Sequence, residues 1–517
     1  MKNMNLREKI GQMIMTGFPS SNITPELIHL IEEYKLGNII LFAYNVLTLE
    51  QISSHCEELH RRIEAATGFP ALIAIDQEGG VVTRLPKEAC NVPGAMLIGA
   101  TGREEYAYRA GYITGAELRA IGINMDLAPV LDVNSNPDNP VIGTRSYSSD
   151  AAVVERYGCN MMKGLEEAGV MPTVKHFPGH GDTAVDSHLG LPVVDKDLQQ
   201  LRSVELVPFI NAIKQGVPCV MTSHILFPKL ESENVPATMS KTILTGLLRE
   251  QLGFQGIIIT DCLEMGAIVH YYGTAKGAVE AIKAGAQLLC ISHTPTLVME
   301  SIHKIEEAVH SGEIPMEIID AAVESILKIK EKYRYDANTA GQVPIDRTGF
   351  KKEIEEIMAA GITKVTKEEL PAVKEDTVIL GCYAYRSTLV SSPVNKDLHF
   401  AKYLTEKINC RYMDIPLDPK PEDISQILQE LGNASSVVYG LYNGHMNRGQ
   451  ISLANAVSRS GRTLIAATLR NPYDLALLEE GIHKLAVYEY NKEVFDALLK
   501  ILKKEAVATG VLPVKLK

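Results

Sequence analysis

The sequence has no apolar run that approaches the roughly 18 residues of a membrane-spanning helix, so no membrane partner is expected. Its first residues, MKNMNLREKIGQMIM, contain no uninterrupted apolar stretch and no small-residue cleavage site, which argues against a secretion signal. The net charge of −12 argues against a nucleic-acid partner and against docking on an anionic membrane. None of the eight cysteines forms a CxxC pair, and several lie in apolar runs, as reduced and buried thiols do. These absences predict a cytoplasmic protein, whose oligomeric state is not readable from the sequence.

The chain of 517 residues is too long for one ordinary domain, and two domains are the natural expectation. Residues 1–335 alternate short apolar runs with longer amphipathic segments. The apolar runs lie at 12–18, 37–42, 71–76, 123–130, 170–177, 218–224, 256–261 and 286–292. Buried-type strands that alternate with helices indicate a parallel sheet, and eight such units predict an α/β fold of the (β/α)8 TIM-like barrel type.

A change of composition marks the end of the predicted barrel. Residues 336–372 begin as a polar, turn-rich stretch and continue as one helix, so we interpret them as a linker. Residues 373–517 contain four further apolar runs that alternate with helical segments. This pattern predicts a smaller, layered α/β sandwich domain at the C-terminus.

Unusual polar residues cluster where the predicted barrel strands end. They are Asp76, Asp132, Lys175, His176, His224 and Asp261. Barrel enzymes place their chemistry at the carboxyl ends of the strands, whereas random surface polarity would fall at both ends. The clustering therefore predicts one functional face.

The densest group of titratable residues is the segment 175–188, KHFPGHGDTAVDSH, whose glycines and proline predict a loop. Three interpretations are open. The segment could hold a metal ion, although it lacks an HExxH pattern, or its histidines and aspartates could simply fix the loop. In the third interpretation, Asp186 hydrogen-bonds one ring nitrogen of His188 and raises the imidazole pKa, so that the other nitrogen shuttles a proton.

Two other strand ends carry candidate carboxylates. Asp261 follows the apolar run of residues 256–260 and is either a helix N-cap or a catalytic carboxylate. Asp76 ends an earlier strand, and Gly79-Gly80 allows a tight turn that could return Arg84 to the same rim. Carboxylates and guanidinium groups at one rim suit sugar hydroxyls, which both donate and accept hydrogen bonds.

Seven segments, taken in order, resemble the family 3 glycoside hydrolases, and specifically their β-N-acetylglucosaminidase branch. The segments are Asp76-Gln-Glu-Gly-Gly, Leu127-Ala-Pro-Val-Leu-Asp132, Ile142-Gly-Thr-Arg145-Ser-Tyr-Ser, Lys175-His-Phe-Pro-Gly-His-Gly-Asp, Asp186-Ser-His188, Pro236-Ala-Thr-Met-Ser240 and Thr260-Asp261. The stretch Leu469-Arg-Asn-Pro-Tyr-Asp474 resembles the second domain of two-domain, Gram-positive-type members. Departures from the family pattern occur at Val81, Cys262 and Gln287.

The resemblance implies a barrel and a double-displacement reaction that retains the anomeric configuration. It makes Asp261 the nucleophile and Asp186 with His188 the acid–base dyad, whereas family β-glucosidases take a glutamate from the second domain. Its substrate-binding positions correspond to Asp76, Arg84, Arg145, Lys175 and His176. It implies neither a metal ion nor a cofactor.

We therefore expect an exo-acting enzyme that hydrolyses terminal β-linked N-acetylglucosamine from a small carbohydrate. A cytoplasmic location would suit muropeptide recycling or the breakdown of imported chitin fragments. Three alternatives stay open: a phosphorylase, because a histidine acid–base group tolerates an incoming phosphate anion; a family β-glucosidase; and a sugar-binding module without activity. The C-terminal domain is expected to be structural or to affect the approach of larger substrates.

Overall fold

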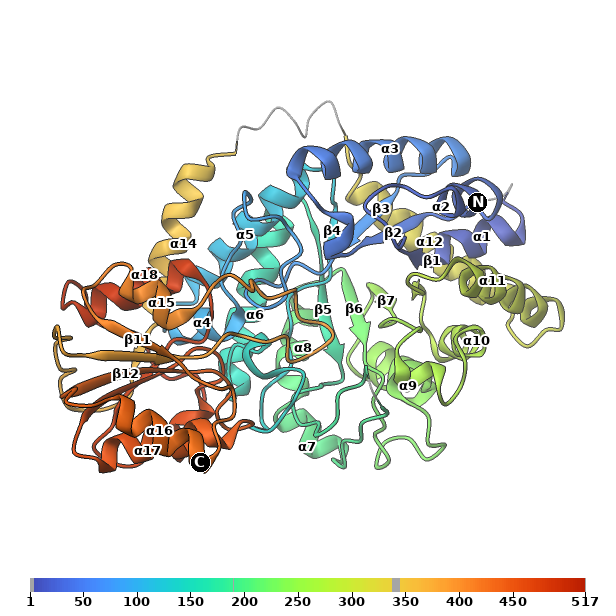
Figure 1. Ribbon diagram of the computed structural model, residues 1–517. Coiled ribbons are helices and arrows are strands. Elements are labelled where there is room, and N and C mark those ends of the chain that lie inside the picture. Colours follow the sequence, from blue (N-terminus) through green and yellow to red (C-terminus); the bar gives the residue numbers. More distant parts are fainter. Residues whose placement is uncertain (1–3, 189, 337–344, 517) are drawn as a thin grey trace.

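The computed structural model describes residues 4–188, 190–336 and 345–516, which form a barrel domain and a second, smaller domain (Figure 1). The barrel sheet consists of β1 (Ile14–Thr16), β2 (Asn38–Leu41), β3 (Leu72–Ile75), β4 (Met125–Asp126), β5 (Met171–Phe177), β6 (Cys219–Thr222), β7 (Ile257–Ile259) and β8 (Leu289–Cys290). Every neighbouring pair in the order β7-β6-β5-β4-β3-β2-β1-β8 is parallel, and a parallel bridge from Ile259 to Leu288 joins β7 to β8. The predicted (β/α)8 barrel is confirmed.

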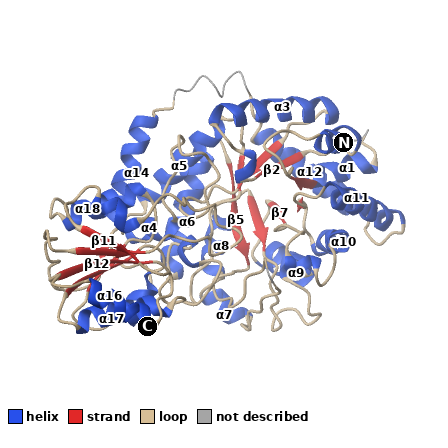
Figure 2. Cartoon of the chain, in the orientation of Figure 1, coloured by secondary structure: helices blue, strands red, loops and turns tan. Residues whose placement is uncertain are grey.

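Helices surround this sheet (Figure 2). They are α1 (Leu6–Met13), α2 (Pro25–Glu33), α3 (Leu49–Thr67), α4 (Ala95–Ala100), α5 (Glu105–Ala120), α6 (Ala151–Glu167), α7 (Leu198–Ser203), α8 (Leu206–Lys214), α9 (Gly266–Val269), α10 (Thr274–Ala284), α11 (Pro295–His310), α12 (Met316–Lys332) and the π-helical segment η4 (Thr242–Gln251). Because the helices cover the outer face of the sheet and side chains fill its inside, the strands are buried on both faces and most of their residues are apolar.

Helix α3 shows why these segments become helices. The Thr48 hydroxyl accepts a hydrogen bond from the Gln51 N–H at the start, and Gly68 takes a left-handed φ of 79° at the end. Apolar side chains recur between these caps at helical spacing and are buried, namely those of Ile52, Cys56, Leu59 and Ile63. Among the helices that the structure describes, none is both long and apolar enough to cross a bilayer.

The second domain is an α/β sandwich, as predicted. Its sheet has the order β11-β10-β12-β13-β14-β9, in which only the pairing of β9 with β14 is antiparallel. The strands are β9 (Thr363–Lys364), β10 (Val378–Gly381), β11 (Arg411–Asp414), β12 (Ser436–Leu441), β13 (Thr463–Thr468) and β14 (His483–Ala486). Helices α14 (Arg347–Gly361), α15 (Phe400–Thr405) and α18 (Lys492–Leu502) cover one face, and α16 (Pro421–Glu430) and α17 (Arg448–Arg459) cover the other (Figures 1 and 2).

Two strands of this sheet have no counterpart in the sequence prediction. Strand β11 lies at one edge with mostly exposed side chains, so it has no apolar run to reveal it. Strand β9 lies within the segment interpreted as a linker, which also contains α14. Since β9 pairs with β14, the end of that segment is part of the second sheet, while residues 337–344 lie outside the described chain.

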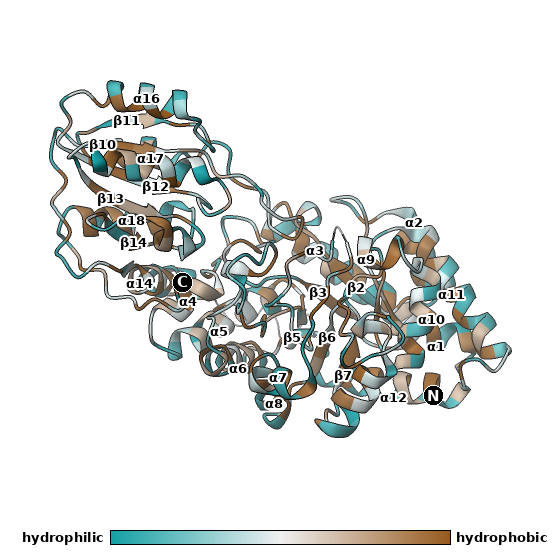
Figure 3. Ribbon diagram, turned by 90° about the horizontal axis from the view of Figure 1, so that it is seen from below, coloured by the Kyte–Doolittle hydropathy of each residue, from teal (hydrophilic) through white to brown (hydrophobic). Residues whose placement is uncertain are grey.

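The two domains contact each other beside the mouth of the barrel, and hydrophobic residues concentrate in the sheet and inner helix faces of each one (Figure 3). The Asn134 side-chain N–H donates to the Tyr473 hydroxyl at 2.6 Å, and the Gly94 N–H donates to the Glu489 carboxylate. C-terminal residues 511–513 return to hydrogen-bond with the barrel domain. The second domain is therefore held on the barrel from several sides.

Candidate active site

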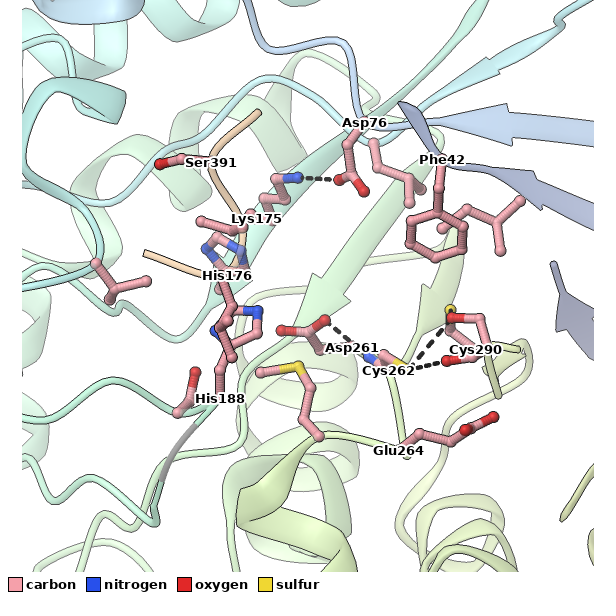
Figure 4. A pocket seen from close by; sticks show the side chains of 18 of the residues that line it. Phe42, Asp76, Lys175, His176, His188, Asp261, Cys262, Glu264, Cys290 and Ser391 are labelled. Carbon is pink, nitrogen blue, oxygen red and sulfur yellow. Dashed lines mark hydrogen bonds and ion pairs between the residues drawn. The ribbon is translucent and has the colours of Figure 1, made fainter. Parts of the chain in front are cut away.

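A cavity of about 550 Å³ opens at the carboxyl ends of the barrel strands (Figure 4). Seven of the eight predicted site residues line it, namely Asp76, Arg84, Arg145, Lys175, His176, His188 and Asp261. The eighth, Asp186, is hydrogen-bonded to His188 and does not belong to the cavity lining itself. The barrel thus gathers in one place residues that are up to 185 positions apart, from Asp76 to Asp261.

Asp261 follows β7 and lies in the middle of the cavity (Figure 4). Its Oδ1 accepts a hydrogen bond of 2.7 Å from the Cys262 N–H. Burial opposes ionisation of this carboxyl, but the imidazoles of His224, His176 and His188 outweigh burial, so the pKa of Asp261 lies below its usual value. Asp261 is therefore an anion at neutral pH, and its carboxylate faces the cavity instead of capping a helix, because α9 begins only at residue 266.

Asp186 and His188 form the hydrogen-bonded pair that their spacing predicts. Asp186 Oδ1 contacts His188 Nδ1 at 2.7 Å and also accepts the His188 backbone N–H at 2.9 Å. Burial disfavours the Asp186 anion, but these bonds to His188 more than compensate, and the pKa of Asp186 is lowered. Because Nδ1 is bound to Asp186, Nε2 is the ring nitrogen left to exchange a proton with a ligand.

A network of buried ion pairs forms another part of the cavity wall. The Lys175 ammonium contacts Asp76 at 2.6 Å and Glu78 at 2.8 Å, and the Arg145 guanidinium binds both oxygens of Glu78 at 2.7 and 2.8 Å. Burial alone would raise the pKa of Glu78, but the two cations hold it well below its ordinary range. The network fixes the polar atoms of Asp76, Lys175 and Arg145 at the cavity surface without leaving a net buried charge uncompensated.

Three buried histidines have structural partners. His176 Nδ1 contacts Asp132 at 2.7 Å, and His224 is held by the Thr238 hydroxyl at 2.8 Å. His180 contacts two hydroxyl groups, and burial lowers its pKa to about 4, so its ring is neutral at neutral pH. For His180, the structure agrees with the interpretation that histidines fix the loop.

The second domain supplies part of the cavity wall through the segment of residues 386–393. Arg84 connects the two domains here, because its guanidinium donates to the Val390 carbonyl at 2.8 Å and to the Ser392 hydroxyl at 3.0 Å. The Ser392 hydroxyl also accepts the Thr83 N–H at 2.9 Å. Arg84 therefore has two roles in the structure: it lines the cavity and it attaches the second domain to its rim.

Sequence reasoning missed three features of this site. Glu78 lies inside the motif that begins at Asp76, but its ion pairs with Arg145 and Lys175 are visible only in three dimensions. The wall segment 386–393 carries no motif that would have signalled it. Tyr44, which is 41% exposed, lies on the cavity wall with its ring stacked on Phe42 and its hydroxyl 2.7 Å from a nitrogen of His293.

The fold and the site together define a barrel enzyme whose cavity presents an ionised carboxylate, an oriented imidazole and a paired network of cations and carboxylates. Such a set is suited to nucleophilic and acid–base chemistry on a polyhydroxylated ligand. Comparison with known families gives the class. The glycosyl hydrolase family 3 N terminal domain matches residues 5–329, and the chain belongs to this family of glycoside hydrolases.

Three similar proteins match nearly the whole chain, whereas other relatives named β-hexosaminidase match 52–57% of it. A β-hexosaminidase A from Pseudoalteromonas piscicida is 31% identical over 96% of this chain and 91% of its own length. A solved structure of a family 3 β-N-acetylglucosaminidase from Paenibacillus sp. FPU-7 superposes with a TM-score of 0.91 at 36% identity and covers 99% of both chains. A β-glucoside phosphorylase shares the fold, with a TM-score of 0.84 over 99% of this chain and 95% of its own at 22% identity. The predicted family resemblance is confirmed.

Proposed function

We propose that this protein is a retaining exo-β-N-acetylglucosaminidase that releases terminal β-linked N-acetylglucosamine through a covalent glycosyl-enzyme intermediate. The observation that carries the proposal is that His188, hydrogen-bonded to Asp186 behind it, lines the same cavity as the ionised Asp261. Relatives named β-hexosaminidase and β-N-acetylglucosaminidase support the choice of sugar.

In the first step, the Asp261 carboxylate attacks the anomeric carbon while His188 donates a proton to the leaving oxygen. Asp186 stabilises the imidazolium that this role requires, because its carboxylate lies 2.7 Å from Nδ1. The proton leaves from Nε2, and His188 becomes neutral. Retaining glycosidases usually use a second carboxylate in this role. An imidazole that is neutral after donating its proton does not place a further negative charge beside the carboxylate of Asp261.

In the second step, neutral His188 removes a proton from water as the water attacks the anomeric carbon. The bond to Asp261 breaks, its carboxylate is regenerated, and the sugar leaves with its original configuration. The backbone N–H of Cys262 stabilises the carboxylate oxygen as the negative charge returns, since it already donates to Oδ1 at 2.7 Å.

The sugar hydroxyls are assigned to the paired network of the cavity wall. Asp76 accepts hydrogen bonds, whereas Lys175, Arg145 and Arg84 donate them, and His176 provides a further polar contact. A cavity of about 550 Å³ is in the range of small-ligand sites, which suits one terminal sugar and part of its aglycone. A muropeptide fragment and a chitin fragment are the proposed natural substrates, both met in the cytoplasm.

A second candidate is a phosphorylase of the same family. The observation in its favour is His188 itself, because a neutral imidazole would repel an incoming phosphate dianion less than a carboxylate would. In that reaction phosphate oxygen, in place of water, would attack the intermediate and yield the sugar 1-phosphate.

Initial rates on the 4-nitrophenyl β-glycosides of N-acetylglucosamine and glucose, with and without phosphate, test the proposal. We expect cleavage of the N-acetylglucosaminide alone, at a rate indifferent to phosphate, with β-configured product in the first minutes of a proton NMR time course. Phosphate stimulation with a sugar 1-phosphate product would establish the phosphorylase instead. Preference for the glucoside would overturn the assignment of the dyad. A first product with the α-configuration would overturn the retaining mechanism.

A further inference from the structure

Two cysteines line the same side of the cavity, and one of them adjoins the proposed nucleophile (Figure 4). Cys262 follows Asp261 directly, and Cys290 ends β8. Both thiols are free, and six of the eight cysteines are buried, Cys290 included. Cys262 is one of two cysteines with partial exposure, and the other, Cys410, lies in the second domain.

The barrel holds these two thiols close together. Strands β7 and β8 are joined by the bridge that closes the ring, and beyond it the Leu263 N–H donates to the Cys290 carbonyl at 2.8 Å. Both sulfur atoms lie beside the Ser292 hydroxyl, at 3.3 Å for Cys262 and 3.7 Å for Cys290. Because both sulfurs contact one hydroxyl group, and the residue after Cys262 is hydrogen-bonded to Cys290, rotation of the two side chains is the movement that would bring the sulfurs to bonding distance.

Cys262 also has the properties of a reactive thiol. A hydrogen bond from the Cys290 thiol is the main reason why the pKa of Cys262 is lowered, and contacts with Ser292 add to the effect against the cost of burial. Cys410 differs, because burial raises the pKa of its thiol. A thiolate is the form that attacks oxidants, and the cavity gives small molecules access to Cys262.

We propose that Cys262 and Cys290 form an oxidative modification site, at which a hydroperoxide joins the two thiols in a disulfide and inactivates the enzyme. With hydrogen peroxide as the hydroperoxide, the Cys262 thiolate attacks one oxygen, the O–O bond breaks, and the departing hydroxide takes up one proton and leaves as water, so that Cys262 becomes a sulfenic acid. The Cys290 thiol then attacks this sulfur, the S–O bond breaks and a second water leaves. Two thiols are oxidised by two electrons, and one hydroperoxide is reduced.

The disulfide would act on the proposed nucleophile through the backbone. The Cys262 N–H donates to Asp261, and the Cys262 carbonyl accepts a hydrogen bond from His224 at 2.9 Å. Drawing the Cys262 sulfur from its contacts with Ser292 to a bond length of about 2.05 Å from Cys290 would shift this peptide. Since a displacement of about 1 Å can cost on the order of 100-fold in rate, we expect a loss of at least about tenfold.

The test compares reduced enzyme with enzyme treated with hydrogen peroxide. Peptide mapping is expected to find a linked pair of peptides containing Cys262 and Cys290, lighter by two hydrogen atoms than the separate peptides. Activity on 4-nitrophenyl N-acetylglucosaminide is expected to fall in parallel and to return with dithiothreitol. The activity readout rests on the proposed function, whereas the mapped cross-link does not. If the untreated enzyme were inactive, the proposed function would be wrong, and the cross-link alone would test the oxidation site.

Matched variants make the result specific. Peroxide treatment should not change the activity of Cys262→Ser or of Cys290→Ser, each measured against the same variant before treatment. Cys410→Ser should lose activity on treatment, as the unmodified protein does. Absence of the Cys262–Cys290 cross-link would overturn the proposal. So would a peroxide-induced loss that persists in both cavity variants, or one that dithiothreitol does not reverse, since methionine oxidation near the site would then be responsible.

Discussion

The cavity has two walls of opposite character. The barrel wall is rigid and buried: Lys175 is 1% exposed and is bound to two carboxylates at once. The wall from the second domain is an irregular segment whose Leu389 is 54% exposed, and it is attached to the barrel mainly through hydrogen bonds of Arg84 and Ser392. The difference is that Asp261 and the buried ion pairs lie at the strand ends of the barrel, where their neighbours fix them, whereas the second domain contributes a partly exposed loop to the same cavity.

The largest effect is expected from the barrel wall. Asp261→Ala removes the proposed nucleophile and should lower kcat by about 10⁴-fold or more on every substrate. Stopped and continuous assays with both aryl glycosides and an oligosaccharide measure this, and circular dichroism checks that the variant is folded. A loss confined to one substrate would contradict the assigned role.

His188→Ala should discriminate between leaving groups. Proton donation contributes about 10²–10⁴-fold when the leaving oxygen is a poor leaving group, but an activated aryl oxide departs without it. We expect a large loss of kcat/KM on a disaccharide and a much smaller loss on the 4-nitrophenyl glycoside. Equal losses on both substrates would argue that His188 only positions the sugar.

Glu78→Gln tests whether the buried network stabilises the barrel wall. The change leaves Arg145 and Lys175 with less compensating charge, and breaking a buried pair costs about 3–5 kcal/mol. We expect a lower Tm and a raised KM. Glu104→Gln is the matched control, because its pair with Arg156 is about half exposed and such pairs contribute about 1 kcal/mol or less. Similar Tm losses in both variants would contradict the rigid-wall description.

Ser392→Ala tests the loop wall and should have a smaller effect. It removes hydrogen bonds to Thr83 and Arg84, each worth about 0.5–1.5 kcal/mol. KM should rise a few-fold with kcat almost unchanged, and more for an oligosaccharide than for an aryl glycoside. Ser387→Ala, on the same segment but outside the cavity lining, should leave KM unchanged. A fall in kcat instead would show that the loop fixes catalytic groups.

The smallest effect concerns pH and the contact between the domains. Burial raises the pKa of Glu489 from 4.5 to about 7. Between pH 4.5 and pH 7 the unfolded chain has lost the proton that the folded protein keeps. The free energy of unfolding is therefore unaffected by this group below about pH 4.5 and decreases as pH rises towards 7. Glu489→Gln should therefore raise Tm by a few degrees at pH 8 and leave it nearly unchanged at pH 5. An equal Tm change at both values would contradict the titration.

The sequence revealed elements whose side chains are apolar on both faces. Strand β7 is an uninterrupted isoleucine run and was predictable, whereas β11 has exposed side chains and was not. The same difference separates the candidate residues. Asp261 was visible because it ends a buried strand, but Glu78 looks like any surface glutamate until Arg145 is folded against it. The spacing of apolar residues along the sequence predicts which segments are buried, but it does not predict which distant cation pairs with which carboxylate.

The sequence by itself determined the barrel, the family and the order of the carboxylates and histidines along one functional face, because strand periodicity and motif spacing are local properties of the chain. Only the tertiary structure decided that His188, held by Asp186, shares a cavity with Asp261, that Arg84 meets Ser392 of the second domain, and that Cys262 and Cys290 both contact Ser292. The physical reason is that closing the ring from β7 to β8 and docking the second domain bring together residues that are distant in sequence.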